Sequence, residues 1–280
     1  MSPVTLSVEP SIQSSVKLVF DTEILAHNYE RLSADRQYKS GQSLISELGV
    51  APGERVLDVG SGTGLLAEFT ADAVGHSGAV VGIDPLPLRV ELAKRRSRPN
   101  LTFAVGDAND LSSFAKESFD VVYLNAVFHW LHEKLSPLRQ FNRVLKANGR
   151  LGITTGDKEH TSVLQSLKSE VLSREPYRSY PGALNGAAYS VSLVELVNLL
   201  DQTGFAVQKI ELQPTNHYHP TEEAAIAFFE ASSFGNFLGH LPEELRVSAR
   251  TEITAELKKH RTSKGISLDG VRFLAIAVKR

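Results

Sequence analysis

The sequence contains no cysteine. This absence excludes disulfides, thiolate nucleophiles and cysteine-ligated zinc sites as sources of stability or chemistry. Long apolar runs are missing as well, because no stretch approaches the ~18 consecutive apolar residues expected of a membrane span. The composition therefore predicts a soluble protein with no membrane partner.

Dense positive charge is equally scarce. Lysine and arginine together number 30 against 32 aspartates and glutamates, which gives a formal net charge of -2. Nucleic-acid binding normally requires a concentrated basic surface, so DNA and RNA are not expected as partners. The first twenty residues lack a basic leader followed by a long apolar run, and the default expectation is a cytoplasmic protein.

The chain does have length and a regular alternation of patterns. Its 280 residues suffice for one large α/β domain with a smaller substrate-covering insertion. Short buried-strand runs alternate with helical periodicity, which is typical of a parallel sheet with helices on both faces. Strands are expected at 55–59, 79–83, 101–105, 119–124, 150–154, 205–212 and 271–278, and helices between them near 63–74, 86–97 and 133–146.

Changes in pattern divide the chain into six expected segments. They are a flexible leader at 1–20, N-terminal helices at 21–50, a nucleotide-binding core at 51–156, a core continuation with a variable segment at 157–212, a helical cap insertion at 213–270 and a last core strand at 271–280. Within the insertion, helices are expected from Thr221 and after Pro242. Such an insertion would cover a pocket.

The strongest local signal is the glycine-rich turn Asp58-Val59-Gly60-Ser61-Gly62-Thr63-Gly64, which follows a buried strand and opens a helix. Glycine lets the backbone approach a ligand without side-chain obstruction. In dinucleotide sites such a turn receives a pyrophosphate. Here Asp58 lies two residues before Gly60, and its carboxylate would repel phosphate and suit a cationic amino group.

Three further polar positions follow the ends of successive strands. Asp84 closes the second strand, where a carboxylate can accept the hydroxyls of a ribose. Asp107 with Ala108 follows the third strand and could read an adenine edge, and Asn125 ends the fourth. Because open α/β sheets bind ligands at the carboxyl ends of their strands, these groups are expected to face one ligand.

These elements resemble the class I S-adenosylmethionine-dependent methyltransferases, particularly the small-molecule branch with trans-aconitate and malonyl-carrier-protein methyltransferases. The resemblance covers roughly residues 25–155 and includes the run Asn125 to Leu131. It implies a Rossmann-like, seven-stranded, mostly parallel sheet whose last strand is antiparallel. It also implies S-adenosylmethionine as cofactor and S-adenosylhomocysteine as product. The absence of cysteine argues against the cysteine-bound substrates of arsenite methyltransferases.

The resemblance also implies which residues form the site. Asp58 and the glycine turn would hold the methionine moiety, Asp84 the ribose, and Asp107 with Ala108 the adenine, while the N-terminal helices would fold over the cofactor. The full set of expected cofactor-binding residues is Asp58, Gly60, Ser61, Gly62, Gly64, Asp84, Pro85, Asp107, Ala108, Asn125, Tyr29 and Tyr38, with Gln37 nearby. Trp130, His129 and Tyr29 are the expected substrate-binding residues.

His129 is the candidate catalytic residue. An alcohol, phenol or amine acceptor must lose a proton during transfer, and imidazole titrates near neutral pH. The alternative is a structural histidine that caps a helix or fills the cleft, since a carboxylate acceptor needs no base. The histidine pairs His129 with His132 and His217 with His219 lack enough nearby carboxylates to predict a metal site.

The sequence thus predicts methyl transfer to a small-molecule acceptor, with O-methylation favoured over N- or C-methylation, by a monomer or homodimer. Two alternatives stay open. A methyltransferase-like fold can bind the cofactor and catalyse a non-methylating reaction or act as an interaction module. A nicotinamide-dependent oxidoreductase shares the sheet and the ribose-binding acid, but Asp58 counts against it.

Overall fold

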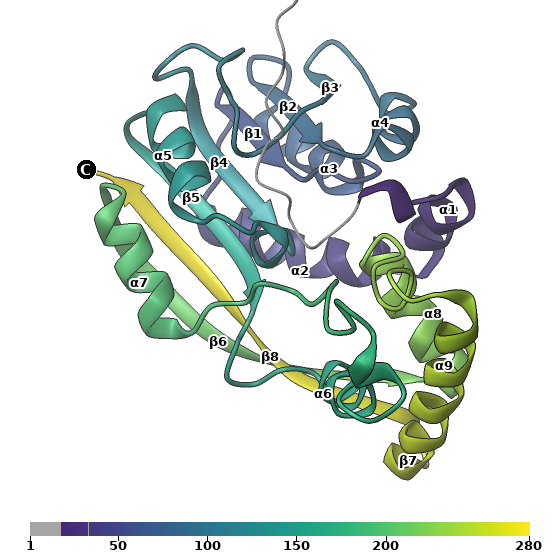
Figure 1. The fold of residues 1–280 in the computed structure, drawn as a ribbon. Coiled ribbons are helices and arrows are strands. Elements are labelled where there is room, and N and C mark those ends of the chain that lie inside the picture. The colour runs from purple at the N-terminus through teal and green to yellow at the C-terminus, as the bar shows by residue number, and fades with distance from the viewer. Residues whose placement is uncertain (1–17, 33) are drawn as a thin grey trace, which may run out of the picture.

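The computed structural model describes residues 18–32 and 34–280, so most of the expected flexible leader lies outside the described residues. Figure 1 shows a central twisted sheet with helices on both faces. The α-helices are α1 (Glu23–Leu32), α2 (Ala34–Leu48), α3 (Leu65–Val74), α4 (Pro87–Lys94), α5 (Leu135–Val144), α6 (Val163–Leu172), α7 (Leu193–Gln202), α8 (Glu222–Ser232) and α9 (Glu243–Leu257). Short 3-10 helices are η1 (Leu18–Phe20), η2 (Phe128–Trp130), η3 (Tyr177–Ser179) and η4 (Lys258–His260).

The strands form one mixed sheet in the order β3-β2-β1-β4-β5-β8-β6. They are β1 (Arg55–Val59), β2 (Ala79–Asp84), β3 (Leu101–Val105), β4 (Phe119–Asn125), β5 (Leu145–Gly156), β6 (Phe205–His219), β7 (Arg261–Thr262) and β8 (Gly265–Lys279). The first five pair in parallel, and β8 is antiparallel to both β5 and β6. The expected mostly parallel sheet with an antiparallel last strand is confirmed, with the two-residue β7 added against β8.

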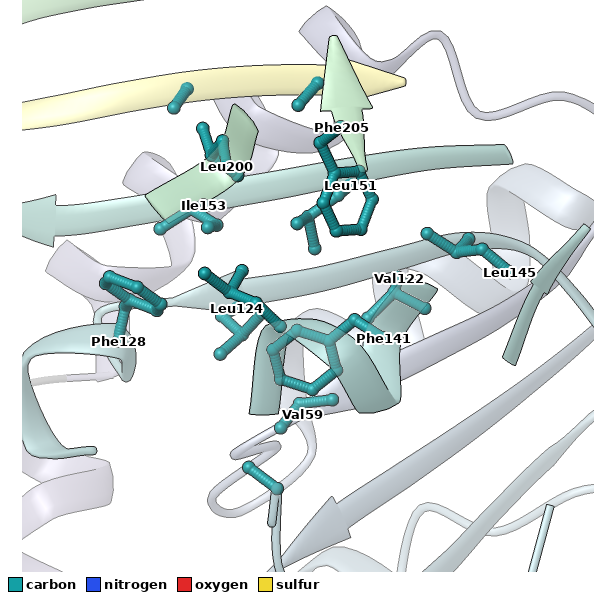
Figure 2. Packing of buried hydrophobic residues seen from close by; sticks show 14 of the residues in the cluster. Val59, Val122, Leu124, Phe128, Phe141, Leu145, Leu151, Ile153, Leu200 and Phe205 are labelled. Carbon is teal, nitrogen blue, oxygen red and sulfur yellow. The ribbon is translucent and has the colours of Figure 1, made fainter. Parts of the chain in front are cut away.

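Strand residues alternate between the two faces of the sheet, and each face has its own apolar core. In β4, Val121 and Tyr123 pack with α2, α3 and α4, whereas Val122 and Leu124 pack with α5 and α7. Figure 2 shows the second of these cores, where Phe141 of α5 lies beside the strand residues. The order of strands reverses between β1 and β4, which opens a ligand-binding crevice at their carboxyl ends.

The strands β6 and β8 are longer than the sequence predicts. They pair from Phe205 opposite Lys279 to His219 opposite Ile266, with one shift of register between Val207 and Lys209. The segments 213–219 and 265–270 are therefore strand rather than helical insertion. Their sequence is polar and contains a proline and glycines, which weakens the usual strand signal. In Figure 1 this long pair runs from the sheet towards α9.

The helices α6, α8 and α9, together with the far ends of β6 and β8, form a subdomain that we call the cap. It has a third apolar core of its own, to which α6 contributes Leu164 and Val171 and α9 contributes Ile253 and Leu257. Thr221 caps α8 by accepting a hydrogen bond from the Ala224 amide, as the sequence predicts. The segment 157–212, expected to continue the core with a variable part, supplies α6 to this cap core.

No helix in the described part of the chain combines the length and apolarity needed to cross a membrane.

Candidate functional site

A cavity of about 630 Å³ lies at the carboxyl ends of the parallel strands, and we call it the strand-end cavity. It continues towards a small inner pocket of about 40 Å³ beside β1. Of the residues predicted from the sequence, the strand-end cavity brings together Tyr29, Gly60, Gly62, Asp84, Pro85, Asp107, Ala108, Asn125 and Trp130. The inner pocket adds Tyr38, Asp58 and Ser61, whereas Gly64 lines neither and instead begins α3.

The glycine turn has the backbone that its sequence predicts. Gly60 and Gly62 have φ angles of 77° and 54°, a region that side-chain-bearing residues rarely adopt. The Gly60 and Ser61 amides both donate to the Ile83 carbonyl, at 2.7 and 2.9 Å, which fastens the turn to β2. A Cβ atom on Gly60 would lie 2.3 Å from Cγ2 of Val127. The turn is therefore closely packed against Val127, which also lines the strand-end cavity.

Asp58 lies at the inner pocket with only 3% of its surface exposed. The Tyr123 hydroxyl donates to its carboxylate at 2.8 Å. Burial raises the pKa of Asp58 to about 7, opposed by the Tyr123 hydrogen bond and reinforced by the charge of Asp84. The Ser61 hydroxyl in the same pocket is buried without a hydrogen-bond partner among the described residues. The pocket therefore fits a ligand end that carries a cation and polar atoms.

Asp84 is held in place by two backbone amides. The Gly62 amide donates to Oδ2 and the Leu86 amide to Oδ1, both at 2.9 Å. Burial raises the pKa of Asp84, while the positive charge of Arg89 lowers it. The carboxylate thus has a fixed orientation at the wall of the strand-end cavity. Asp107 is exposed instead, and its Oδ1 accepts from the Asn109 amide at 2.8 Å.

Arg89 of α4 is a residue of this site that the sequence did not reveal. It lines the strand-end cavity, and its side chain is 3% exposed beside Asp21, which is 2% exposed, with Nε 3.2 Å from the Asp21 carboxylate. It also donates to the Ala231 carbonyl of α8 at 3.1 Å and lies over the Tyr29 ring at 4.3 Å. One guanidinium thus links the N-terminal segment, α4 and the cap. The sequence did contain one signal for this role, namely an arginine on a face of α4 that is otherwise apolar.

A second cavity, of about 570 Å³, lies between the carboxyl ends of β4 and β5 and the cap, and we call it the cap cavity. It shares Gln37, Ala126, Trp130 and Ser232 with the strand-end cavity. Trp130 packs edge-on against Phe234, which follows α8, with ring centroids 4.9 Å apart. The two cavities therefore meet just beyond the end of β4 and share a wall built from α2, the segment after β4 with η2, and α8.

His129 lines the cap cavity, and its Nδ1 lies 3.2 Å from the Thr155 hydroxyl. Burial, together with the nearby charge of Lys134, lowers its pKa to about 3. The imidazole is therefore neutral at ordinary pH and a weak base. The burial of His129 could not be predicted from the sequence, because the residues that cover its imidazole come from other segments of the chain. No group of three or more metal-ligating side chains occurs among residues 18–32 and 34–280.

Comparison with known proteins identifies the protein family. Residues 57–153 match the model of the methyltransferase domain family. The aklanonic acid methyltransferase of a Streptomyces species is 30% identical over 151 residues, which are 52% of this chain and 67% of that protein. An arsenite methyltransferase of Halobacterium salinarum is 31% identical over 174 residues, 59% of this chain and 40% of that protein. The chain thus spans less than half the length of the haloarchaeal relative.

Among solved structures, a phosphoethanolamine N-methyltransferase of Haemonchus contortus in complex with S-adenosylhomocysteine has a similar fold. Its TM-score is 0.59 at 18% identity, covering 97% of this chain and 61% of that protein. The chain belongs to the class I S-adenosylmethionine-dependent methyltransferases. Its cofactor is S-adenosylmethionine, the methyl donor of that family.

Proposed function

We propose that this protein transfers a methyl group from S-adenosylmethionine to a small molecule bound in the cap cavity, and that the acceptor atom is an oxygen. The observation that carries this proposal is the meeting of the two cavities at Gln37, Ala126 and Trp130. A cofactor in the strand-end cavity and an acceptor in the cap cavity would face each other there. Holding the reactants in this way can supply about 7 to 11 kcal/mol of the barrier reduction.

When bound, the cofactor supplies a methyl group already activated by its sulfonium. We propose that Asp58 and Ser61 bind the methionine end, because the inner pocket contains a buried carboxylate and an unpartnered hydroxyl. Asp84 would accept from the ribose, and Asp107 with Ala108 would contact the adenine. The remaining proposed cofactor contacts are Gly60, Gly62, Pro85, Asn125, Tyr29 and Tyr38.

The affinity for S-adenosylhomocysteine is expected to depend on Asp58 and on pH. Because the Asp58 pKa is raised to about 7, the ligand-free carboxyl is mostly protonated below that pH. The cationic amino group of the ligand prefers the ionised form, so affinity rises with pH and levels off above about 7. At about pH 6 roughly one-tenth of the carboxyl is ionised, and affinity should be about tenfold below the plateau.

Calorimetric titration across this pH range measures the effect. Asp58→Asn should bind more weakly and lose the pH step. Asp107→Asn, which alters an exposed carboxyl of the same cavity, should keep the step. A wild-type affinity that stayed constant from about pH 6 to about pH 8 would contradict the role given to Asp58.

His129 is proposed to orient the acceptor rather than to remove its proton. With a pKa of about 3, the neutral ring can accept a hydrogen bond from a hydroxyl but holds a proton poorly. His129→Ala should lower kcat about tenfold, the value of one lost hydrogen bond, and leave S-adenosylhomocysteine affinity within about twofold. The pH profile of kcat should have the same shape in the variant. If the wild-type profile of kcat had an inflection near neutral pH that the variant lacked, His129 would act as the general base instead.

Incubation with methyl-labelled cofactor and small-molecule extracts tests the activity itself. We expect label in a small molecule whose mass increases by one methylene and whose methyl group is attached to oxygen. Tight S-adenosylhomocysteine binding without label transfer would instead favour the non-methylating alternative. Binding of nicotinamide cofactors in place of S-adenosylhomocysteine would favour the oxidoreductase.

A further inference from the structure

The charged side chains that line the cap cavity differ in how they are paired. Lys158 donates to Glu195 at 2.8 Å. Asp157 lies 2.5 Å from the Nδ1 atom of His160. Arg272 of β8 is the exception, because it forms no ion pair with any described residue. The cavity therefore has one guanidinium that forms no direct ion pair with a carboxylate of the described residues.

The hydrogen bonds of Arg272 all go to neutral partners. Its Nε and Nη2 atoms donate to the amide oxygen of Gln213, at 3.0 and 2.8 Å, and its Nη1 donates to the hydroxyl of Ser40. These three bonds leave about two of the five N–H donors of a guanidinium without a partner among the described residues. Glu211, whose field reaches Arg272, forms an ion pair with Lys209 at 3.2 Å, and Lys209 also pairs with Glu47 at 3.0 Å.

The position of Arg272 is fixed by the sheet. Its Cα is paired with that of Gly156 in β5 on one side and with that of Gln213 in β6 on the other. The side chain is half-buried, and burial lowers its pKa, although an arginine stays protonated at any ordinary pH. A partly desolvated guanidinium in a fixed place is a strong site for an oxyanion, since it binds carboxylates through two parallel hydrogen bonds.

We propose that the methyl acceptor carries a carboxylate that binds Arg272, and that the apolar remainder of the molecule packs against Phe228 and Phe229 of α8. These two aromatic residues line the same cavity. The inference rests on the proposed function, because it concerns the acceptor of that reaction. The substrate class is therefore a small amphiphilic carboxylic acid with an aromatic or aliphatic body.

The cofactor also has a carboxylate, and the placement of Arg272 argues for the acceptor instead. Arg272 lines the cap cavity, whereas the residues around the strand-end cavity and the inner pocket do not include it. Ser40, its hydroxyl partner, likewise lines the cap cavity. Comparison of S-adenosylhomocysteine with 5′-methylthioadenosine, which lacks that carboxylate, distinguishes the two sources.

Trp130 gives a direct readout, because it is the single tryptophan of the chain and lines the cap cavity. Protein saturated with S-adenosylhomocysteine is titrated with matched probes, 2-naphthoate against 2-naphthamide and 3-phenylpropanoate against 3-phenylpropanamide, while tryptophan fluorescence is followed. The wild type should bind each acid at least about tenfold more tightly than its amide, as expected for a charge-assisted bidentate contact. Arg272→Gln should lose this preference, and Arg272→Lys should keep part of it.

Lys158→Gln is the matched control, because Lys158 lines the same cavity but already forms an ion pair with Glu195. This variant should keep the preference for the acid over the amide. Equal binding of acids and amides by the wild type, or no binding of either, overturns the proposal. So does a result in which Arg272→Gln weakens S-adenosylhomocysteine but not 5′-methylthioadenosine, since Arg272 would then bind the cofactor's carboxylate. Failure of the wild type to bind S-adenosylhomocysteine at all would instead overturn the proposed function.

Discussion

Arg89→Met is expected to lower the free energy of unfolding by about 3 to 5 kcal/mol, the usual effect of removing one partner of a buried ion pair. The variant would leave the Asp21 carboxylate almost fully buried without its cation. It would also remove the hydrogen bond to the Ala231 carbonyl, which ties α4 to α8. Urea denaturation without ligand measures this change directly.

Two further variants test whether this loss of stability comes from the buried ion pair. The double variant Asp21→Asn with Arg89→Met should recover part of the lost stability, because no unpaired charge remains buried. Lys94→Met on the same helix removes an exposed pair with Glu91 and should change stability by less than about 1 kcal/mol. If Arg89→Met behaved like Lys94→Met, the buried pair would have no structural importance.

Gly60→Ala is expected to destabilise the ligand-free protein by about 2 to 4 kcal/mol, from a left-handed backbone that costs alanine about 1 to 2 kcal/mol and from overpacking that costs about as much again. The new methyl group would lie 2.3 Å from Cγ2 of Val127, so the turn or that side chain must move. Affinity for S-adenosylhomocysteine should fall as well, because Gly60 lines both the inner pocket and the strand-end cavity.

Gly62→Ala is the control for Gly60→Ala. It has the same kind of backbone, but the nearest neighbour of its new methyl group is Tyr29, at an ordinary contact distance of 3.5 Å. The backbone effect of about 1 to 2 kcal/mol should therefore be all that remains. Adding Val127→Ala to Gly60→Ala removes the colliding methyl groups and should recover part of the stability. Equal destabilisation by the two glycine variants in the absence of ligand would show that the collision is unimportant.

The placement of the residues at the strand ends could be predicted from sequence because its determinants are local. The glycine turn and Asp84 belong to strand-turn-helix units whose pattern is short and regular, and parallel strands bring their carboxyl ends to one edge. The structure places Asp58, Asp84 and Asp107 around adjoining pockets at that edge. The antiparallel last strand was also expected and is confirmed.

The rest depends on contacts between distant segments, which sequence patterns do not encode. Arg89 meets Asp21 across 68 positions of chain, and Arg272 meets Ser40 across 232. The low pKa of His129 comes from burial by other segments, so its chemistry could not be judged from its residue type. The extended ends of β6 and β8 were missed because polar residues in an antiparallel ribbon resemble loop sequence.

The separate apolar core of the cap makes the molecule modular. The α-helices of the cap arise from two stretches of chain, one after β5 and one between β6 and β8, whereas the glycine turn and Asp84 precede both. Exchange of those stretches would reshape the cap cavity and leave the glycine turn in place. A fold of this kind lets evolution or design change the lining of the cap cavity while the turn after β1 is kept.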